Sequence, residues 1–129
     1  MNKTACLMLV LVLVFVAAPV FAAEATQMWS CELDDDATEA EVMAGAAAWL
    51  EAAKKLDGGK NLEAYVYFPV AVNAMGEMDA MFVVVAPSFE EWGKFWDAYE
   101  GSEAAIIENQ NNETVVCPDS VLWESIKVK

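Results

Sequence analysis

The cysteines have the most specific chemistry in this 129-residue chain, and their positions favour a disulfide. Cys6 lies beside an apolar N-terminal segment and would be lost with it on export, which leaves Cys31 and Cys117 as a pair. An even number of cysteines in an oxidising compartment predicts a disulfide, here one that closes a long loop. The alternative is a pair of free thiols or metal ligands. The chain contains no histidine, so a zinc or copper thiolate site would lack its usual further ligands.

Two other clusters could bind metal ions. Met75, Met78 and Met81 recur at every third residue, which suggests thioether ligands for Cu(I) in an exported protein. The simpler interpretation is that Met81 fills the core, because it shares a strand face with valines. The acidic run 34–36 with Glu39 could gather oxygens around Ca²⁺, but the helix dipole alone accounts for acidic residues at a helix start. We therefore predict no cofactor and keep a periplasmic Cu(I) or Ca²⁺ binder as the second alternative.

The missing residue types limit the catalytic chemistry. With no histidine and no arginine, the chain cannot form a Ser-His-Asp triad, an imidazole general base or a bidentate arginine clamp. Catalysis would depend on other groups, for which Asn73, Tyr65 and Tyr67 are the candidates. The same three residues and Trp96 are the candidates for binding a ligand. We leave enzymatic activity open and favour a non-catalytic protein.

The N-terminus has the organisation of a secretory signal. A lysine precedes the apolar run 7–16, and small residues then allow cleavage after Ala22 or one of the next alanines. The alternative is an uncleaved anchor, but the run is short against the roughly 20 residues that span a bilayer. We predict a signal peptide at 1–22 and one domain at 23–129, located in the periplasm or secreted.

The net charge of the mature domain excludes some classes of binding partner. All seven basic residues are lysines and one of them lies in the signal, so six lysines stand against 21 acidic residues. The resulting net charge of −15 repels nucleic acid and anionic membrane surfaces, which both require a basic footprint. We expect no nucleic-acid partner and no membrane association once the signal is removed.

Strand patterns occur along most of the mature chain. Strands are predicted at 28–33, 62–73, 79–86, 114–117 and 121–128, with a turn at Pro118 and Asp119 between the last two. Pro69 cannot donate a ladder hydrogen bond, so the second strand is expected at a sheet edge or with a bulge. The second and third strands are apolar on both faces, so we expect other parts of the protein or a partner to pack on both sides of them.

Two helices are predicted from their N-terminal caps. Thr38 and Glu41 match the capping-box pattern, and Ser88 and Glu91 repeat it. The apolar stripe of the first helix consists of Val42, Ala46, Trp49, Leu50, Ala53 and Leu56. The second helix carries aromatic residues that we expect mainly in the core, namely Phe89, Trp92, Phe95, Trp96 and Tyr99. A further helical piece is expected at 102–109, after an interruption at Gly101.

The order of these elements, β-α-β-β-α-β, predicts the fold. It is typical of a ferredoxin-like α+β sandwich, an antiparallel sheet of order 4-1-3-2 with two helices on one face. The first and last strands are neighbours in that order, so Cys31 and Cys117 could meet across the ladder. A second subunit could cover the other face of the sheet, forming a homodimer.

The length, the element order and the aromatic helix after the third strand resemble the dimeric α/β-barrel superfamily, in which two ferredoxin-like sheets pair face to face. Trp29-Ser30-Cys31 behind a signal peptide, the helix start at 89–92 and the late Cys117 are similar to uncharacterised exported bacterial members. The resemblance implies a homodimer and a range of activities, from small-molecule monooxygenation, haem degradation and isomerisation to simple binding. Haem-handling members commonly use a histidine ligand, which this chain lacks.

Two hypotheses follow. The leading one is a non-catalytic exported domain that binds a small, partly apolar ligand or serves an interaction role. The alternative is a cofactor-independent enzyme of the monooxygenase kind, with Asn73, Tyr65 or Tyr67 and Trp96 near the substrate.

Overall fold

The computed structural model describes residues 23–71 and 78–128. Four strands and three helices follow one another along these residues: β1 (Glu24–Leu33), α1 (Glu39–Ala53), β2 (Glu63–Tyr67), β3 (Ala80–Ala86), α2 (Phe89–Asp97), α3 (Glu103–Asn111) and β4 (Val115–Ser125). The predicted signal peptide at 1–22 lies outside the described residues. Within the described part of the chain, no helix combines the length and apolar character needed to cross a bilayer.

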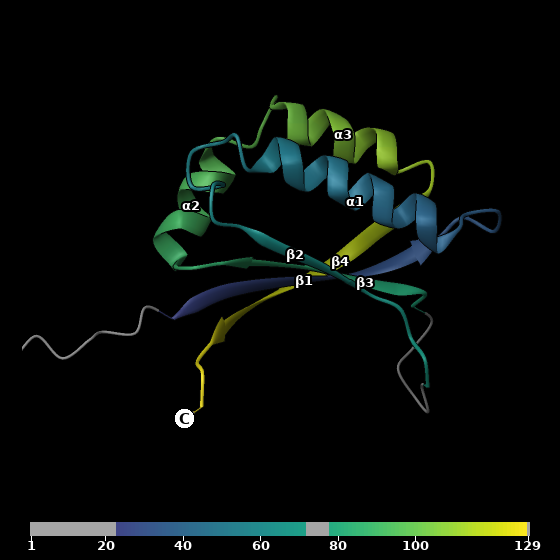
Figure 1. The fold of residues 1–129 in the computed structure, drawn as a ribbon, viewed down its shortest axis with the longest axis horizontal. Coiled ribbons are helices and arrows are strands. Elements are labelled where there is room, and N and C mark those ends of the chain that lie inside the picture. The colour runs from purple at the N-terminus through teal and green to yellow at the C-terminus, as the bar shows by residue number, and fades with distance from the viewer. Residues whose placement is uncertain (1–22, 72–77, 129) are drawn as a thin grey trace, which may run out of the picture.

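The four strands form one antiparallel sheet in the order β2-β3-β1-β4, which is the predicted ferredoxin-like order 4-1-3-2. All three helices cover the same face of this sheet, with α1 and α3 side by side and α2 at one end (Figure 1). The further helical piece predicted after Gly101 is present as α3, so three helices lie on this face. The chain turns at Gly101, whose φ of 73° suits glycine, and α2 and α3 are therefore separate helices.

The strand register assigns residues to the two faces of the sheet. Trp29 lies opposite Phe82, and Phe82 lies opposite Val66. These three side chains face the helices, where they pack on the core or line the space beneath α1. Alternate residues point to the other face, which we call the open face because no described helix covers it (Figure 1). Its central row runs across all four strands as Tyr65, Val83, Met28 and Val121.

The helix starts follow the predicted caps. At α1 the capping box is complete, because Glu41 N–H donates to Thr38 Oγ1 at 3.3 Å and Thr38 N–H donates to Glu41 Oε2 at 2.9 Å. At α2 the Ser88 hydroxyl accepts from Glu91 N–H at 3.1 Å. The Glu91 carboxylate accepts from Asn61 Nδ2 at 3.3 Å instead of reaching back to Ser88. The second predicted capping box is therefore only half formed.

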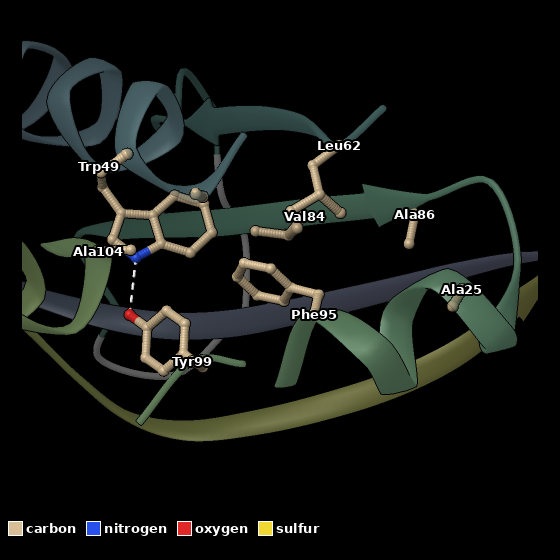
Figure 2. Packing of buried hydrophobic residues seen from close by; sticks show 10 residues of the cluster. Ala25, Trp49, Leu62, Val84, Ala86, Phe95, Tyr99 and Ala104 are labelled. Carbon is tan, nitrogen blue, oxygen red and sulfur yellow. Dashed lines mark hydrogen bonds between the residues drawn. The ribbon is translucent and has the colours of Figure 1, made fainter. Parts of the chain in front are cut away.

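The core lies between the helices and the sheet, and aromatic rings fill much of it (Figure 2). Phe95 of α2 is 1% exposed and its ring meets those of Trp49 and Tyr99 at centroid distances of 6.0 and 5.3 Å. Of the predicted aromatic set, Trp92 and Trp96 are partly buried against this core, whereas Phe89 is exposed. Burial of these rings stabilises the domain.

β2 and β4 differ from their predicted limits. β2 lies at an edge of the sheet, one of the two predicted arrangements, but it ends at Tyr67, before Pro69. The predicted turn at Pro118 and Asp119 is wrong, because β4 runs through both residues. The register of β1 and β4 shifts by one residue between Ser30 and Glu32. This bulge accommodates Pro118, which has no N–H to contribute to the ladder.

The predicted disulfide is present and lies at this bulge. Cys31 of β1 and Cys117 of β4 are bonded, with an S–S distance of 2.06 Å and 86 residues between them in sequence. Cys31 is 1% exposed and both cysteines line the space between sheet and helices. The bond therefore ties the first and last strands together on the helix-covered side.

Candidate functional site

A cavity of about 290 Å³ lies between α1, α3 and the sheet. Its volume is at the small end for ligand pockets. Its apolar wall is built from residues on five elements of the fold, chiefly Trp29, Trp49, Val66, Phe82 and Trp96. The disulfide forms part of the same wall.

Small residues on α1 leave room for this cavity. Gly45 and Ala46 line it, in the turn between Val42 and Trp49, which line it as well. α3 approaches α1 closely at Gly45, where a Cβ atom would lie 2.7 Å from Asn111 Oδ1. The space under α1 thus exists because the middle of its inward stripe carries no large side chain.

A chain of hydrogen bonds forms the polar wall. Trp49 Nε1–H donates to the Tyr99 hydroxyl at 2.8 Å, as Figure 2 shows, and that hydroxyl donates to Glu108 Oε2 at 2.5 Å. Burial of the phenol, and then its bond to Glu108, raise the pKa of Tyr99 well above its usual range. Tyr99 is therefore a neutral hydrogen-bond donor and no base. These hydrogen bonds connect the core to the rim of the cavity, since Tyr99 is buried and Glu108 is exposed.

The charged groups of the lining are carboxylates. Glu41 of α1 and Glu108 of α3 line the cavity, and no lysine does so among the described residues. Both of these glutamates are exposed, so they lie where the cavity meets solvent. Hydrogen bonds from the Thr38 backbone and side chain hold the pKa of Glu41 below its usual value. The cavity is thus aromatic inside and acidic at its opening.

The predicted site residues fall in different places. Trp96 lines the cavity. Tyr65 and Tyr67 lie on the open face, with their rings stacked at a centroid distance of 6.3 Å. Asn73 lies outside the described residues. In a single chain the sheet separates Trp96 from the two tyrosines, so these candidates do not form one site there.

Tyr65 is hydrogen-bonded on the open face. Its hydroxyl donates to Glu63 Oε2 at 2.5 Å. That bond, and then the charge of Glu63, raise the pKa of Tyr65 above its usual value. The phenol therefore holds its proton in this arrangement.

The residues considered as metal ligands lie away from the cavity. Met78 and Met81 border a shallow apolar depression on the open face, beside Tyr67. Met81 thus does not fill the helix-covered core, contrary to the simpler prediction, and Met75 is outside the described residues. Among residues 23–71 and 78–128, no group of three or more His, Cys, Asp or Glu side chains is placed to hold a metal ion. The acidic run 34–36 with Glu39 therefore does not form the suggested Ca²⁺ site.

Several cavity residues were not singled out from the sequence as binding groups. From the sequence, Trp29, Trp49 and Phe82 are ordinary strand and core residues, and the pairing of Tyr99 with Glu108 joins the turn after α2 to α3. The one local signal is the run of small residues around Gly45 and Ala46 inside an otherwise bulky helical stripe. Such a run indicates either close helix packing or a space beneath the helix, and here it accompanies both.

The topology and the cavity together define a ferredoxin-like α+β domain with a cavity between its helices and sheet. The sequence matches no protein-family model and no curated protein. Its fold is similar to that of a protein with the provisional name of chlorite dismutase, at a TM-score of 0.50 and 8% identity over 81% of this chain. The chain spans 44% of the length of that protein, and the likeness shows the fold.

Two further solved structures are similar. One is a dimeric protein of unknown function with a ferredoxin-like fold from Bacteroides fragilis NCTC 9343, with 14% identity and a TM-score of 0.47 over 78% of this chain and 95% of that one. The other is a dimeric ferredoxin-like protein of unknown function from Thermobifida fusca YX. It has 14% identity and a TM-score of 0.47 over 79% of this chain and 89% of that one.

Proposed function

We propose that this protein is an exported, non-catalytic binding domain that holds a small, partly apolar molecule in the cavity between its helices and sheet. The observation that carries the proposal is the cavity itself, about 290 Å³ in volume, with tryptophan and phenylalanine side chains in its wall and polar groups at one end. Mostly apolar walls with a few placed polar groups are typical of small-molecule sites.

The groups in the cavity favour binding over catalysis. Tyr99, the titratable group nearest the interior, has a raised pKa and cannot act as a general base near neutral pH. The likeness to a protein named as a chlorite dismutase brings no reaction with it, because 8% identity supports the fold alone. The monooxygenase-like alternative needs Tyr65 or Tyr67 close to Trp96, and the sheet separates them in a single chain.

Native mass spectrometry of the protein purified from a periplasm tests the binding proposal. We expect the wild-type protein to carry a bound small molecule. Ala46→Trp should displace it, because Ala46 lines the cavity. Ala47→Trp is the matched control, since Ala47 is an exposed neighbour on the same helix and does not line the cavity. A wild-type protein without a bound mass, or a mass that persists in Ala46→Trp, contradicts the proposal.

We also propose that the open face pairs with a second copy of the chain. Its central row of Tyr65, Val83, Met28 and Val121 is apolar across all four strands, and no described helix covers it. Glu63 and Glu24 occupy strand ends, where charge suits the rim of an interface. An apolar face of this kind is typical of a protein–protein contact.

Sedimentation velocity of matched variants tests the pairing. Val121 on the open face is 52% exposed, and Ile106 on α3 is 54% exposed, so aspartate at either position leaves the monomer core intact. We expect wild-type protein and Ile106→Asp to sediment as dimers and Val121→Asp as a monomer. The acidic rim should also make the dimer tighter at higher ionic strength. A wild-type monomer at high concentration would overturn the pairing.

Export remains part of the proposal and has a separate test. The disulfide between Cys31 and Cys117 suits an oxidising compartment. We expect the intact mass of the periplasmic protein to begin after Ala22 or a following alanine and to contain no free thiol. A mature protein that retains residues 1–22 would contradict the signal-peptide prediction.

A further inference from the structure

We infer that the molecule held in the cavity is a small organic cation, of the class of substituted ammonium ions. This inference rests on the proposed function, since it names the chemistry of the ligand for the same site. Two features of the cavity carry it: the sign of its charged groups and the aromatic character of its wall.

The charged groups of the cavity select against anions. Glu41 and Glu108 line it, and no lysine among the described residues compensates them. The chain as a whole carries a net charge of −14, so its field draws cations toward the cavity and repels anions. An anionic ligand would meet two carboxylates at the opening and no cationic partner inside.

Glu108 can contact a ligand while it remains hydrogen-bonded to Tyr99. The Tyr99 hydroxyl engages Oε2, and no hydrogen bond to Oε1 occurs in the described part of the chain. Because Tyr99 is itself held by Trp49, the carboxylate is tied to the core through two successive hydrogen bonds. A carboxylate fixed in this way pairs with a cation at a smaller loss of side-chain entropy than a free surface glutamate.

The wall of the cavity suits a cation that carries apolar groups. Three of the five tryptophans of the chain, Trp29, Trp49 and Trp96, line it. Tryptophan binds cations most strongly among the aromatic residues, and aromatic walls are the common means of recognising quaternary ammonium groups. A neutral apolar molecule would contact the rings but would gain nothing from the negative charge of the two carboxylates.

The same geometry argues against an inorganic cation. Ca²⁺ and Mg²⁺ require about six or more oxygen ligands in a compact shell, whereas most of this wall is aromatic and aliphatic. The volume of about 290 Å³ corresponds to roughly ten water molecules, which accommodates an ammonium group with several carbon substituents. An organic ammonium ion is the occupant that fits the carboxylates at the opening, the aromatic wall and the volume of the cavity together.

Binding of a matched pair of compounds tests the inference. Choline and 3,3-dimethyl-1-butanol have nearly the same shape, but only choline is charged. We expect the ligand-free mature protein to bind choline about tenfold or more tightly than the neutral alcohol in calorimetric titration, given the usual strength of cation–π and carboxylate contacts. Raising the salt concentration should weaken choline binding and leave the alcohol unaffected.

Variants then assign the preference to the cavity. Glu108→Gln keeps an oxygen that can accept from Tyr99, so the fold is retained while the charge is lost. We expect it to bind choline about tenfold more weakly and to bind the alcohol as the wild type does. Glu51→Gln is the matched control on the exposed surface of α1. Because Glu51 does not line the cavity, this variant should bind both compounds unchanged.

The outcomes separate this inference from the proposed function. Equal affinity for choline and the alcohol, with both lost in Ala46→Trp, overturns the cation inference and leaves the binding cavity standing. Failure of choline to bind also overturns it. A neutral or anionic molecule found by native mass spectrometry would then preserve the proposed function, and a cavity found empty there would remove both.

Discussion

The two faces of the sheet have similar apolar side chains and different surroundings. On the helix-covered face, Trp29 and Phe82 lie opposite each other beneath α1 and α2, within the aromatic core. Met28, one residue before Trp29, and Val83, one residue after Phe82, lie opposite each other on the open face. The chain covers one of these pairs with its own helices and leaves the other without helical cover (Figure 1).

The polar groups also differ between the two faces. On the covered side they form a series of hydrogen bonds, from the buried Trp49 and Tyr99 to the exposed Glu108. On the open face they bond locally, as in the 2.7 Å hydrogen bond between the Thr26 and Ser125 hydroxyls. Polar groups held at defined positions in an apolar cavity are typical of a small-molecule site, whereas a row of apolar residues needs only a complementary surface. We therefore assign ligand binding to the covered face and self-association to the open one.

The largest expected effect concerns the disulfide on the covered side. Replacing both Cys31 and Cys117 with alanine reopens a loop of 86 residues, which should lower the free energy of unfolding by roughly 4 kcal/mol in the chain-entropy model. Urea denaturation of wild type and double variant, each without reductant, measures the difference. A loss below about 1 kcal/mol would mean that the backbone hydrogen bonds between β1 and β4 hold these strands together and that the disulfide adds little.

A pair of valine substitutions compares the two faces directly. Val84 faces the helices and is 2% exposed, whereas Val121 is on the open face. Val84→Ala should lower the free energy of unfolding by about 2 kcal/mol through lost burial and a cavity. Val121→Ala should cost below about 0.5 kcal/mol at low protein concentration, and more as dimers form. Equal losses at every concentration would show that the open face is already covered within one chain.

The sequence predicted this two-faced sheet because alternation and capping are local. Thr38 and Glu41 are three residues apart and form their capping box wherever the helix packs. The period-2 pattern of β3 assigns its residues to opposite faces before any partner is known. The strand order then followed from the β-α-β-β-α-β sequence of elements.

The cavity and the bulge could not be predicted in the same way. The bond between Tyr99 and Glu108 depends on the angle between α2 and α3 at Gly101, and no local spacing encodes that angle. Pro118 is as typical of a turn as of a bulge, and only its place beside Cys117, where the register of β1 and β4 shifts, decides between them. Tyr65 and Trp96 were grouped as one site because the sequence does not state which sheet face the helices cover.

Two tryptophans on the covered face differ in the hydrogen bonding of their indole N–H groups. Trp49 Nε1–H has a partner in Tyr99, whereas the buried Trp96 Nε1–H has no hydrogen-bond partner among the described residues. Trp49→Phe should therefore be about 1 kcal/mol more destabilising than Trp96→Phe, which removes an unsatisfied donor along with part of a ring. Thermal unfolding of both variants checks the order. The reverse order would mean that burial of the Trp96 ring stabilises the fold by more than its unpaired N–H destabilises it.

The smallest expected effect lies at the rim of the covered face and depends on pH. The hydrogen bonds from Thr38 lower the pKa of Glu41 in the folded protein, so its contribution to stability is present above the ordinary glutamate pKa near 4.5. That contribution is lost as the pH falls through the lowered folded value, because the carboxyl group then takes up a proton in both states. Glu41→Gln should thus unfold at a slightly lower temperature than wild type near neutral pH, and at the same temperature once the pH lies below the lowered pKa of Glu41. Glu51→Gln, on the same helix but outside the cap, should show no such convergence. If the Glu41→Gln difference persists in acid, the glutamine fails as a cap for steric reasons, and the charge of Glu41 contributes nothing to the stability of this rim.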